Sequence, residues 1–106
     1  AENETLAKIQ KHLKLNYNNS KYSSSDLAAV LFISEKTLSR RLKLLFSTTF
    51  TQLLREYRLE RAVEQLKLQK TVQQVAFDCG FGSAAYFGQC FKEKYGSSPG
   101  QVKQNT

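Results

Sequence analysis

The stretch Phe50–Leu66, FTQLLREYRLERAVEQL, decides how this chain folds. Thr49 and Gln52 form a T-x-x-Q capping box, so we expect a helix to begin here. At about 100° per residue, its apolar residues form two stripes on opposite sides. The first stripe is Phe50, Leu53, Leu54 and Tyr57, and the second is Leu59, Ala62, Val63 and Leu66. Because the stripe changes face near Arg58, the pattern indicates a helix that packs on one core with its first half and on another with its second. A wide-faced helix in a single bundle explains the stretch alone equally well.

Composition places the chain among globular proteins with a polyanionic partner. The 106 residues are 41% hydrophobic and 24% charged, enough for one ordinary domain or two very small ones. No apolar run has the length of a membrane span, and we expect no secretory leader. The net charge is +7, and both halves contribute to it: eight Lys and Arg against four acids in residues 1–48, and eight against five in 49–106. Nucleic acid is therefore the first expectation for a partner and an acidic membrane surface the second.

Helical periodicity and capping residues divide the rest of the chain into short helices. We expect helices over residues 4–15, over 26–31 with Ser23 or Ser24 as the cap, and from Ser34 to about residue 46. After the long helix, Thr71 and Gln74 repeat the T-x-x-Q start of a helix over 72–79. A helix over 84–95 ends at Gly96, and a last short turn begins at residues 98–99. Since no strand pattern of useful length is present, the fold class is predicted to be all-α with about seven helices.

The segments before and after the long helix repeat each other. Leu27-Ala28 matches Val75-Ala76 and Ile33 matches Phe81 at an offset of 48, and further matches at an offset of 49 pair Leu38, Leu42 and Lys43 with Phe87, Phe91 and Lys92. A short helix, a tight turn and a longer helix, given twice, is typical of two helix-turn-helix units. The expected organisation is a first subdomain over 1–48, a linker helix over 49–70 and a second subdomain over 71–106. Two unrelated helical hairpins that look alike remain the alternative.

The second helix of each unit presents a set of side chains to solvent. In the first unit the apolar residues Leu38, Leu42, Leu45 and Phe46 are expected to be buried, and Lys36, Ser39, Arg40 and Lys43 lie opposite them. Arg40 can donate two hydrogen bonds to guanine, Lys36 and Ser39 can also reach bases, and Lys43 suits a phosphate. A solvated basic helix face is the simpler alternative.

The equivalent helix of the second unit has fewer charged residues on its exposed face. Its expected buried face is Ala84, Phe87, Phe91 and Tyr95, and its exposed face is Ala85, Gly88, Gln89 and Lys92, with Tyr86 on the flank. Ala85 suits a thymine methyl and Gln89 suits adenine. From residue 71 to residue 91 there is no Lys or Arg, so the first unit should supply most of the polar base contacts. The helix N-termini at Ser23 and Thr71 are further places for phosphates, as is Lys92.

Several runs of residues match a known pattern in order along the chain. They are TVQQVAFDCGF at 71–81, AYF at 85–87, FK at 91–92 and YGSSP at 95–99, together with RLERA at 58–62 and Leu27-Ala28, Ser34, Leu38, Arg40 and Lys43 in the first unit. With these runs the chain resembles the C-terminal signature of the AraC/XylS family of transcription regulators. The resemblance implies a seven-helix domain whose two recognition helices enter successive major-groove segments of duplex DNA. It places Lys36, Ser39, Arg40, Ala84, Ala85, Tyr86, Gly88 and Gln89 at the bases. Further implications are contact with RNA polymerase, a separate sensing or dimerising domain, and a cytoplasmic, nucleoid-associated bacterial protein.

The chain departs from the family at two turns. Phe32 and Ser47 stand where glycine is frequent, and a bulky residue disfavours positive φ. The first turn is therefore expected to be less tight or strained. Gln89 also stands where arginine is frequent, which bears on base contacts in the second unit.

Other classes of function remain possible from the residues alone. A module that binds protein or RNA through helical hairpins is the main alternative. An enzyme is less favoured, since there is one histidine, His12, and no carboxylate cluster or metal-ligand spacing. Cys79 and Cys90 lack C-x-x-C spacing and are expected to fill core space rather than form a redox or metal site. No cofactor and no metal are therefore expected.

Overall fold

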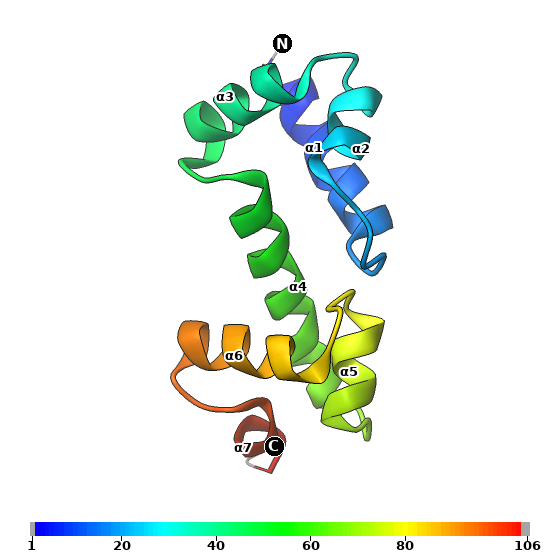
Figure 1. Cartoon of the computed structure of the whole chain (residues 1–106), viewed down its shortest axis with the longest axis vertical. Helices are drawn as coiled ribbons and strands as arrows, with labels where there is room; N and C mark the ends of the chain where they lie inside the picture. The colour runs from blue at the N-terminus through cyan, green and yellow to red at the C-terminus, as the bar shows by residue number, and fades with distance from the viewer. Residues whose placement is uncertain (1, 105–106) are drawn as a thin grey trace.

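The computed structural model describes residues 2–104 and contains seven helices and no strand within them (Figure 1). The helices are α1 (Glu2–Asn16), α2 (Ser24–Val30), α3 (Glu35–Phe46), α4 (Phe50–Leu66), α5 (Val72–Asp78), α6 (Ala84–Tyr95) and α7 (Pro99–Gln104). The all-α prediction is confirmed. α2 begins two residues before the expected start, and α7 is a short helix rather than a single turn.

Side-chain caps set the first residues of most of these helices. The hydroxyls of Ser34, Thr49, Thr71 and Ser83 each accept the backbone N–H three residues on, at 3.0–3.2 Å. At α2 the direction is reversed, because the backbone N–H of Ser23 donates to the Asp26 carboxylate at 2.9 Å. The serine and threonine positions read from the sequence therefore mark the helix starts correctly.

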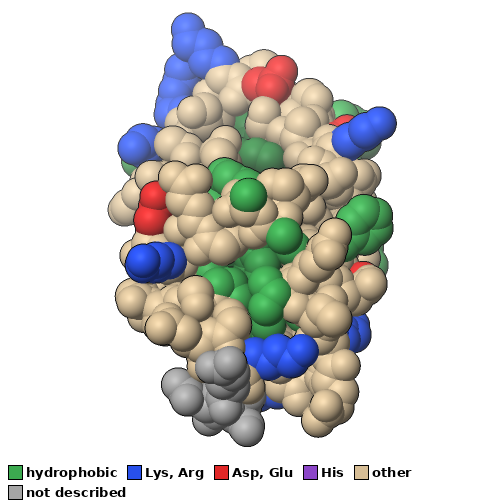
Figure 2. Space-filling view, turned by 60° about the horizontal axis from the view of Figure 1, so that its bottom comes forward, with side chains coloured by type: hydrophobic (Ala, Val, Ile, Leu, Met, Phe, Trp, Pro, Cys, Tyr) green, Lys and Arg blue, Asp and Glu red, His purple; other side chains and the backbone are tan. Residues whose placement is uncertain are grey.

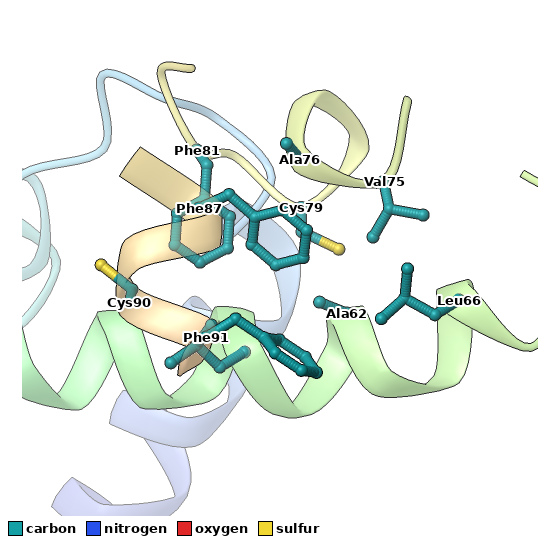
Figure 3. Packing of buried hydrophobic residues seen from close by; sticks show 10 residues of the cluster. Ala62, Leu66, Val75, Ala76, Cys79, Phe81, Phe87, Cys90 and Phe91 are labelled. Carbon is teal, nitrogen blue, oxygen red and sulfur yellow. The ribbon is translucent and has the colours of Figure 1, made fainter. Parts of the chain in front are cut away.

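α4 joins two separate hydrophobic cores. Its first half supplies Leu54, with Phe50, Leu53 and Tyr57 packed alongside, to a core made with α1, α2 and α3. Its second half supplies Leu59, Ala62 and Leu66 to a core made with α5 and α6 (Figure 3). The change of stripe at Arg58 is thus a change of core, and the single-bundle alternative is wrong. The subdomain boundaries at residues 48/49 and 70/71 stay a prediction.

The two helix-turn-helix units end their first helices with the same hydrogen bonds. Ile33 N–H donates to the Ala28 carbonyl at 3.1 Å, and 48 residues later Phe81 N–H donates to the Ala76 carbonyl at 2.9 Å. The residue before each donor has positive φ, 56° at Phe32 and 86° at Gly80. Both turns therefore have the Schellman geometry, in which a left-handed residue ends the helix. The first turn is as tight as the second, so the expectation of a looser turn is wrong and that of a strained one holds.

The buried face of α6 differs from the expected one at three positions. Phe87 and Phe91 are buried as expected, but Ala84 and Tyr95 are exposed and Cys90 is buried. Ala84 is the first residue of the helix and lies beyond the core. Tyr95 is the last residue, and its ring packs on Phe91 at the rim, with centroids 4.6 Å apart. The side chains that reach the core come from the middle of the helix.

Candidate nucleic-acid interface

The outer face of α3 is a free cationic surface. Lys36, Ser39, Arg40 and Lys43 are all exposed, while Leu38 and Leu42 on the opposite side are buried. The start of the helix is tied to α2, since the Ser24 hydroxyl donates to the Glu35 carboxylate at 2.7 Å. None of the three cations forms an ion pair or hydrogen bond with residues 2–104. Their charge therefore remains available to a polyanion.

The matching face of α6 is open but carries little charge. Ala84, Ala85, Tyr86, Gln89 and Lys92 are exposed and Gly88 is half-buried. A Cβ built on Gly88 would meet no atom within 4 Å, so space lies free above this part of the helix. The Tyr86 ring packs against the ring of the buried Phe81, with centroids 6.0 Å apart, and this contact orients the Tyr86 ring.

The end of the molecule that holds α5, α6 and α7 exposes a hydrophobic area. Hydrophobic side chains are visible in the middle of this face, and Lys and Arg side chains lie mostly around its rim (Figure 2). The middle of this face therefore carries few Lys and Arg side chains.

Two grooves join the first unit to the second along one continuous face. One groove, of about 340 Å³, is lined by Lys36, Ser39 and other residues of α2, α3 and α4. The next, of about 310 Å³, is lined by Ser23 on the first unit and Tyr86 on the second. The two grooves share Ser24, Phe50 and Thr51. Four of the sequence-predicted contact residues, Lys36, Ser39, Ser23 and Tyr86, thus line a surface that runs across both units.

The other eight predicted contact residues line neither groove: Arg40, Lys43, Thr71, Ala84, Ala85, Gly88, Gln89 and Lys92. Thr71 and Ser23 are also engaged within their own helix starts. Thr71 is exposed and lines neither groove, and its hydroxyl accepts the Gln74 N–H. Both polar groups of Ser23 are directed at Asp26, with its hydroxyl 3.1 Å from the carboxylate. A phosphate at Ser23 would have to compete with that negative charge. Lys92 is exposed in the last turn of α6, away from both grooves.

Sequence reasoning missed Thr51 and Arg55 on the linker helix. Thr51 lines both grooves, and Arg55 lines the groove between the units and forms no hydrogen bond or ion pair with the described part of the chain. Thr51, Arg55 and Arg58 stand at i, i+4 and i+7, which places them on one face of the helix. That polar stripe between the two apolar ones was the signal that could have revealed them.

The two cysteines are free thiols within the second core. Cys79 and Cys90 are free and buried in the second core, and Figure 3 shows their side chains pointing in different directions. Burial raises the pKa of the Cys79 thiol to about 11, so it is protonated at neutral pH. Residues 2–104 hold no cluster of His, Cys, Asp and Glu arranged for a metal ion, and none of their helices has the length and apolarity to cross a membrane.

Comparison with known proteins identifies the family. A family model described as a helix-turn-helix domain matches residues 27–105. The transcriptional regulator YdeO of Escherichia coli K12 is 34% identical over 79 residues, which are 74% of this chain and 31% of that protein. The chain therefore spans about a third of the length of the curated relatives it matches first.

Solved structures share the whole fold. The C-terminal domain of AraT, a response regulator from Geobacillus stearothermophilus, superimposes with a TM-score of 0.89 at 25% identity, covering 96% of this chain and 85% of that one. The DNA-binding domain of AdpA in complex with a target DNA gives 0.87 at 25% identity, covering 95% and 90%. The fold and the matched sequence define an all-helical DNA-binding domain with two helix-turn-helix units. The chain belongs to the AraC family of helix-turn-helix transcription regulators.

Proposed function

We propose that this chain reads a bipartite site on duplex DNA in a sequence-specific way. α3 would enter one major-groove segment and α6 the next, with the linker helix α4 between them. The observation that carries the proposal is the continuous face that runs from Lys36 and Ser39 across Thr51 and Arg55 to Tyr86. Lys36 on that face, with Arg40 and Lys43 exposed on the same helix, suits the phosphates and base edges of DNA.

The dimensions of the molecule support two successive grooves rather than one. The chain measures 44 × 22 × 22 Å, and Figure 1 shows α3 and α6 near opposite ends of α4, both drawn across the long axis. Successive major-groove segments on one side of B-DNA are about 34 Å apart. An elongated domain of this length fits that spacing, and a shorter bundle would not reach both segments. The AdpA domain of the same fold was solved with DNA bound.

The residue assignments follow from exposure and chemistry. We assign base contacts in the first unit to Lys36, Ser39 and Arg40, and base contacts in the second to Ala84, Ala85, Tyr86, Gly88 and Gln89. Lys43 and Lys92 are assigned to phosphates, and Thr51 and Arg55 extend the phosphate-contacting surface between the two units. Ser23 and Thr71 are weaker candidates, because their hydroxyls are engaged within their own helix starts.

The test compares two cations on α3 with one placed elsewhere. Duplexes selected from a random pool give the preferred site, and fluorescence anisotropy at stated salt gives the affinities. Arg40→Ala should cost about 1–3 kcal/mol on that site and relax the preference at one base pair. Lys43→Ala should weaken all sequences alike and reduce the salt slope by about one. Lys8→Ala serves as the control, because Lys8 lies on α1 in a groove that shares no residue with the interface.

The same assay separates DNA reading from the alternative function. If RNA or poly-dI-dC displaced the selected duplex as well as an unlabelled copy of itself, a general binding module would be the better description. If Arg40→Ala changed neither affinity nor preference, the assignment of α3 would be wrong. Contact with RNA polymerase and a separate sensing or dimerising domain stay predictions from the family.

A further inference from the structure

Arg58 ties the linker helix to the loop between α1 and α2. It lies at the point of α4 where the apolar stripe changes face. Its Nε–H donates to the Tyr17 carbonyl at 2.8 Å, and its Nη2 donates to the Asn19 carbonyl, also at 2.8 Å. These bonds join residues 41 and 39 positions apart in the chain. A charged donor with two backbone acceptors holds that loop in one position.

The second unit packs directly on this same loop. Gly80, in the left-handed turn between α5 and α6, is buried. A Cβ built there would lie 2.2 Å from the Tyr17 carbonyl oxygen and 2.9 Å from Arg58 Nε. The backbone of the second turn therefore touches the backbone of the first unit, without α4 between them. Since no side chain fits in that space, glycine is required for the contact and not only for the turn.

Tyr17 extends the contact into both cores. Its side chain is the one partly buried side chain of residues 2–104 packed against both hydrophobic cores. Its ring meets the ring of Tyr57 on α4, with centroids 5.3 Å apart. Arg58, Tyr17 and Gly80 thus form a joint, by which we mean these three residues, where α4 and both units meet.

The joint lies where it can set the angle between the recognition helices. A single helix fixes the distance between two bodies along its axis, but each body can still turn about its own attachment to it. A contact off that axis removes this freedom. Gly80 stands three residues before Ser83, which caps α6, so displacement of Gly80 moves the second recognition helix. The matching residue of the first unit, Phe32, is 93% exposed, so the joint is not a general consequence of the turn.

We propose that Arg58 is a positioning residue that sets which separation of the two half-sites the protein accepts. The inference rests on the proposed function, because it needs two helices that read DNA together. Loss of the two hydrogen bonds frees the units to turn, so a site of the native spacing is bound less tightly and sites of altered spacing are penalised less. Each unit alone keeps its own core, so the loss appears in the dependence on spacing and not in the folding of either unit.

The experiment measures spacing tolerance rather than affinity alone. The probes are the selected bipartite duplex, the same duplex with one base pair added or removed between its halves, and a duplex that keeps only the half read by α3. The wild-type protein should lose roughly tenfold or more on either altered duplex. In Arg58→Gln and Arg58→Met that loss should fall to about threefold or less, with each affinity taken relative to that of the same variant for the half-site. Because the ratio of two affinities is taken on one protein sample, the folded fraction cancels and a less stable variant is still informative.

Arg61→Gln is the matched control, one turn further along the same helix. Arg61 pairs with Glu64 at 3.6 Å and lies 5.3 Å from the Tyr57 ring centroid, both on α4 itself. It should keep the spacing dependence of the wild type. If the Arg58 variants kept the spacing dependence of the wild type, the positioning role would be overturned while the proposed function stayed intact. A wild-type protein that bound half-sites and bipartite sites equally would instead overturn the proposed function.

Discussion

Replacing Gly80 by alanine should destabilise the protein far more than the same change at Gly96. Both glycines have positive φ, 86° and 79°, so both substitutions place an alanine in the left-handed region. That backbone cost is about 1–2 kcal/mol, and the reduced freedom of alanine in the unfolded chain returns about 0.5–1 kcal/mol. Gly96→Ala should therefore lower the free energy of unfolding by about 0.5–1 kcal/mol, since nothing lies within 4 Å of its new Cβ.

Gly80→Ala adds a steric cost that Gly96→Ala lacks. The new methyl would lie 2.2 Å from a backbone oxygen and 2.9 Å from Arg58 Nε, so the loop or the arginine has to move. Hydrogen bonds that involve a charged group contribute about 1.5–3 kcal/mol each, and at least the bond to Tyr17 is lost or strained. The total for Gly80→Ala is then about 2–4 kcal/mol.

Urea unfolding followed by circular dichroism measures both variants against the wild type. At about 4–8 °C for each kcal/mol, the loss of about 2–4 kcal/mol should lower the melting temperature of Gly80→Ala by on the order of 10–30 °C. The loss of unfolding free energy measured for Gly96→Ala gives the cost of placing alanine at positive φ in the same protein. Equal losses in the two variants would show that the second turn does not press on the first unit, and the joint would have to be abandoned.

Three further predictions concern single sites. Phe32→Gly should raise the free energy of unfolding by about 0.5–1 kcal/mol, because it removes the strain of a phenylalanine with positive φ. Little packing is lost, since the phenylalanine is 93% exposed, and a lower urea midpoint would contradict the prediction. The Asp78 carboxylate accepts hydrogen bonds from Lys70 and Gln74, which hold its pKa below its usual value. Its contribution to stability is therefore complete above the usual pKa of an aspartate and is lost as the pH falls through the lowered pKa. Asp78→Asn should remove that part of the acid dependence in urea titrations, and an unchanged difference between neutral and acidic pH would count against it. Cys79, whose pKa burial raises to about 11, should resist iodoacetamide at pH 7 until the protein is unfolded, as mass spectrometry of the native and denatured protein would show.

Much of this fold could be predicted because its signals are local. The capping hydroxyls act on an N–H three residues away, and the two stripes of α4 lie within seventeen consecutive residues. The repeat was visible because both units use the same turn, whose hydrogen bonds span only five residues. Each of these features is set by chain segments short enough to read directly.

The joint and the groove residues could not be predicted in the same way. The acceptors of Arg58 are backbone carbonyls, which carry no residue signature, and they lie 39 and 41 positions away. The sequence marks Gly80 as a turn glycine, but the turn alone would accept another residue, as Phe32 demonstrates. The exposure of Ala84 and Tyr95 depends on where α6 overhangs its core, which periodicity alone does not determine.

The comparison of Phe32 with Gly80 separates two requirements that usually coincide at such turns. One is a backbone with positive φ, and the other is the absence of a Cβ where another backbone approaches. Both residues stand in the same hydrogen-bonded geometry, so the turn itself imposes the same positive φ on each. Only at Gly80 does another backbone approach within the space of a Cβ. Strain of about 1–2 kcal/mol is therefore tolerated in the first unit, whereas in the second a side chain would separate the units. The second unit therefore requires glycine at this position because its turn meets the loop at Tyr17, whereas the turn of the first unit faces solvent and accepts phenylalanine.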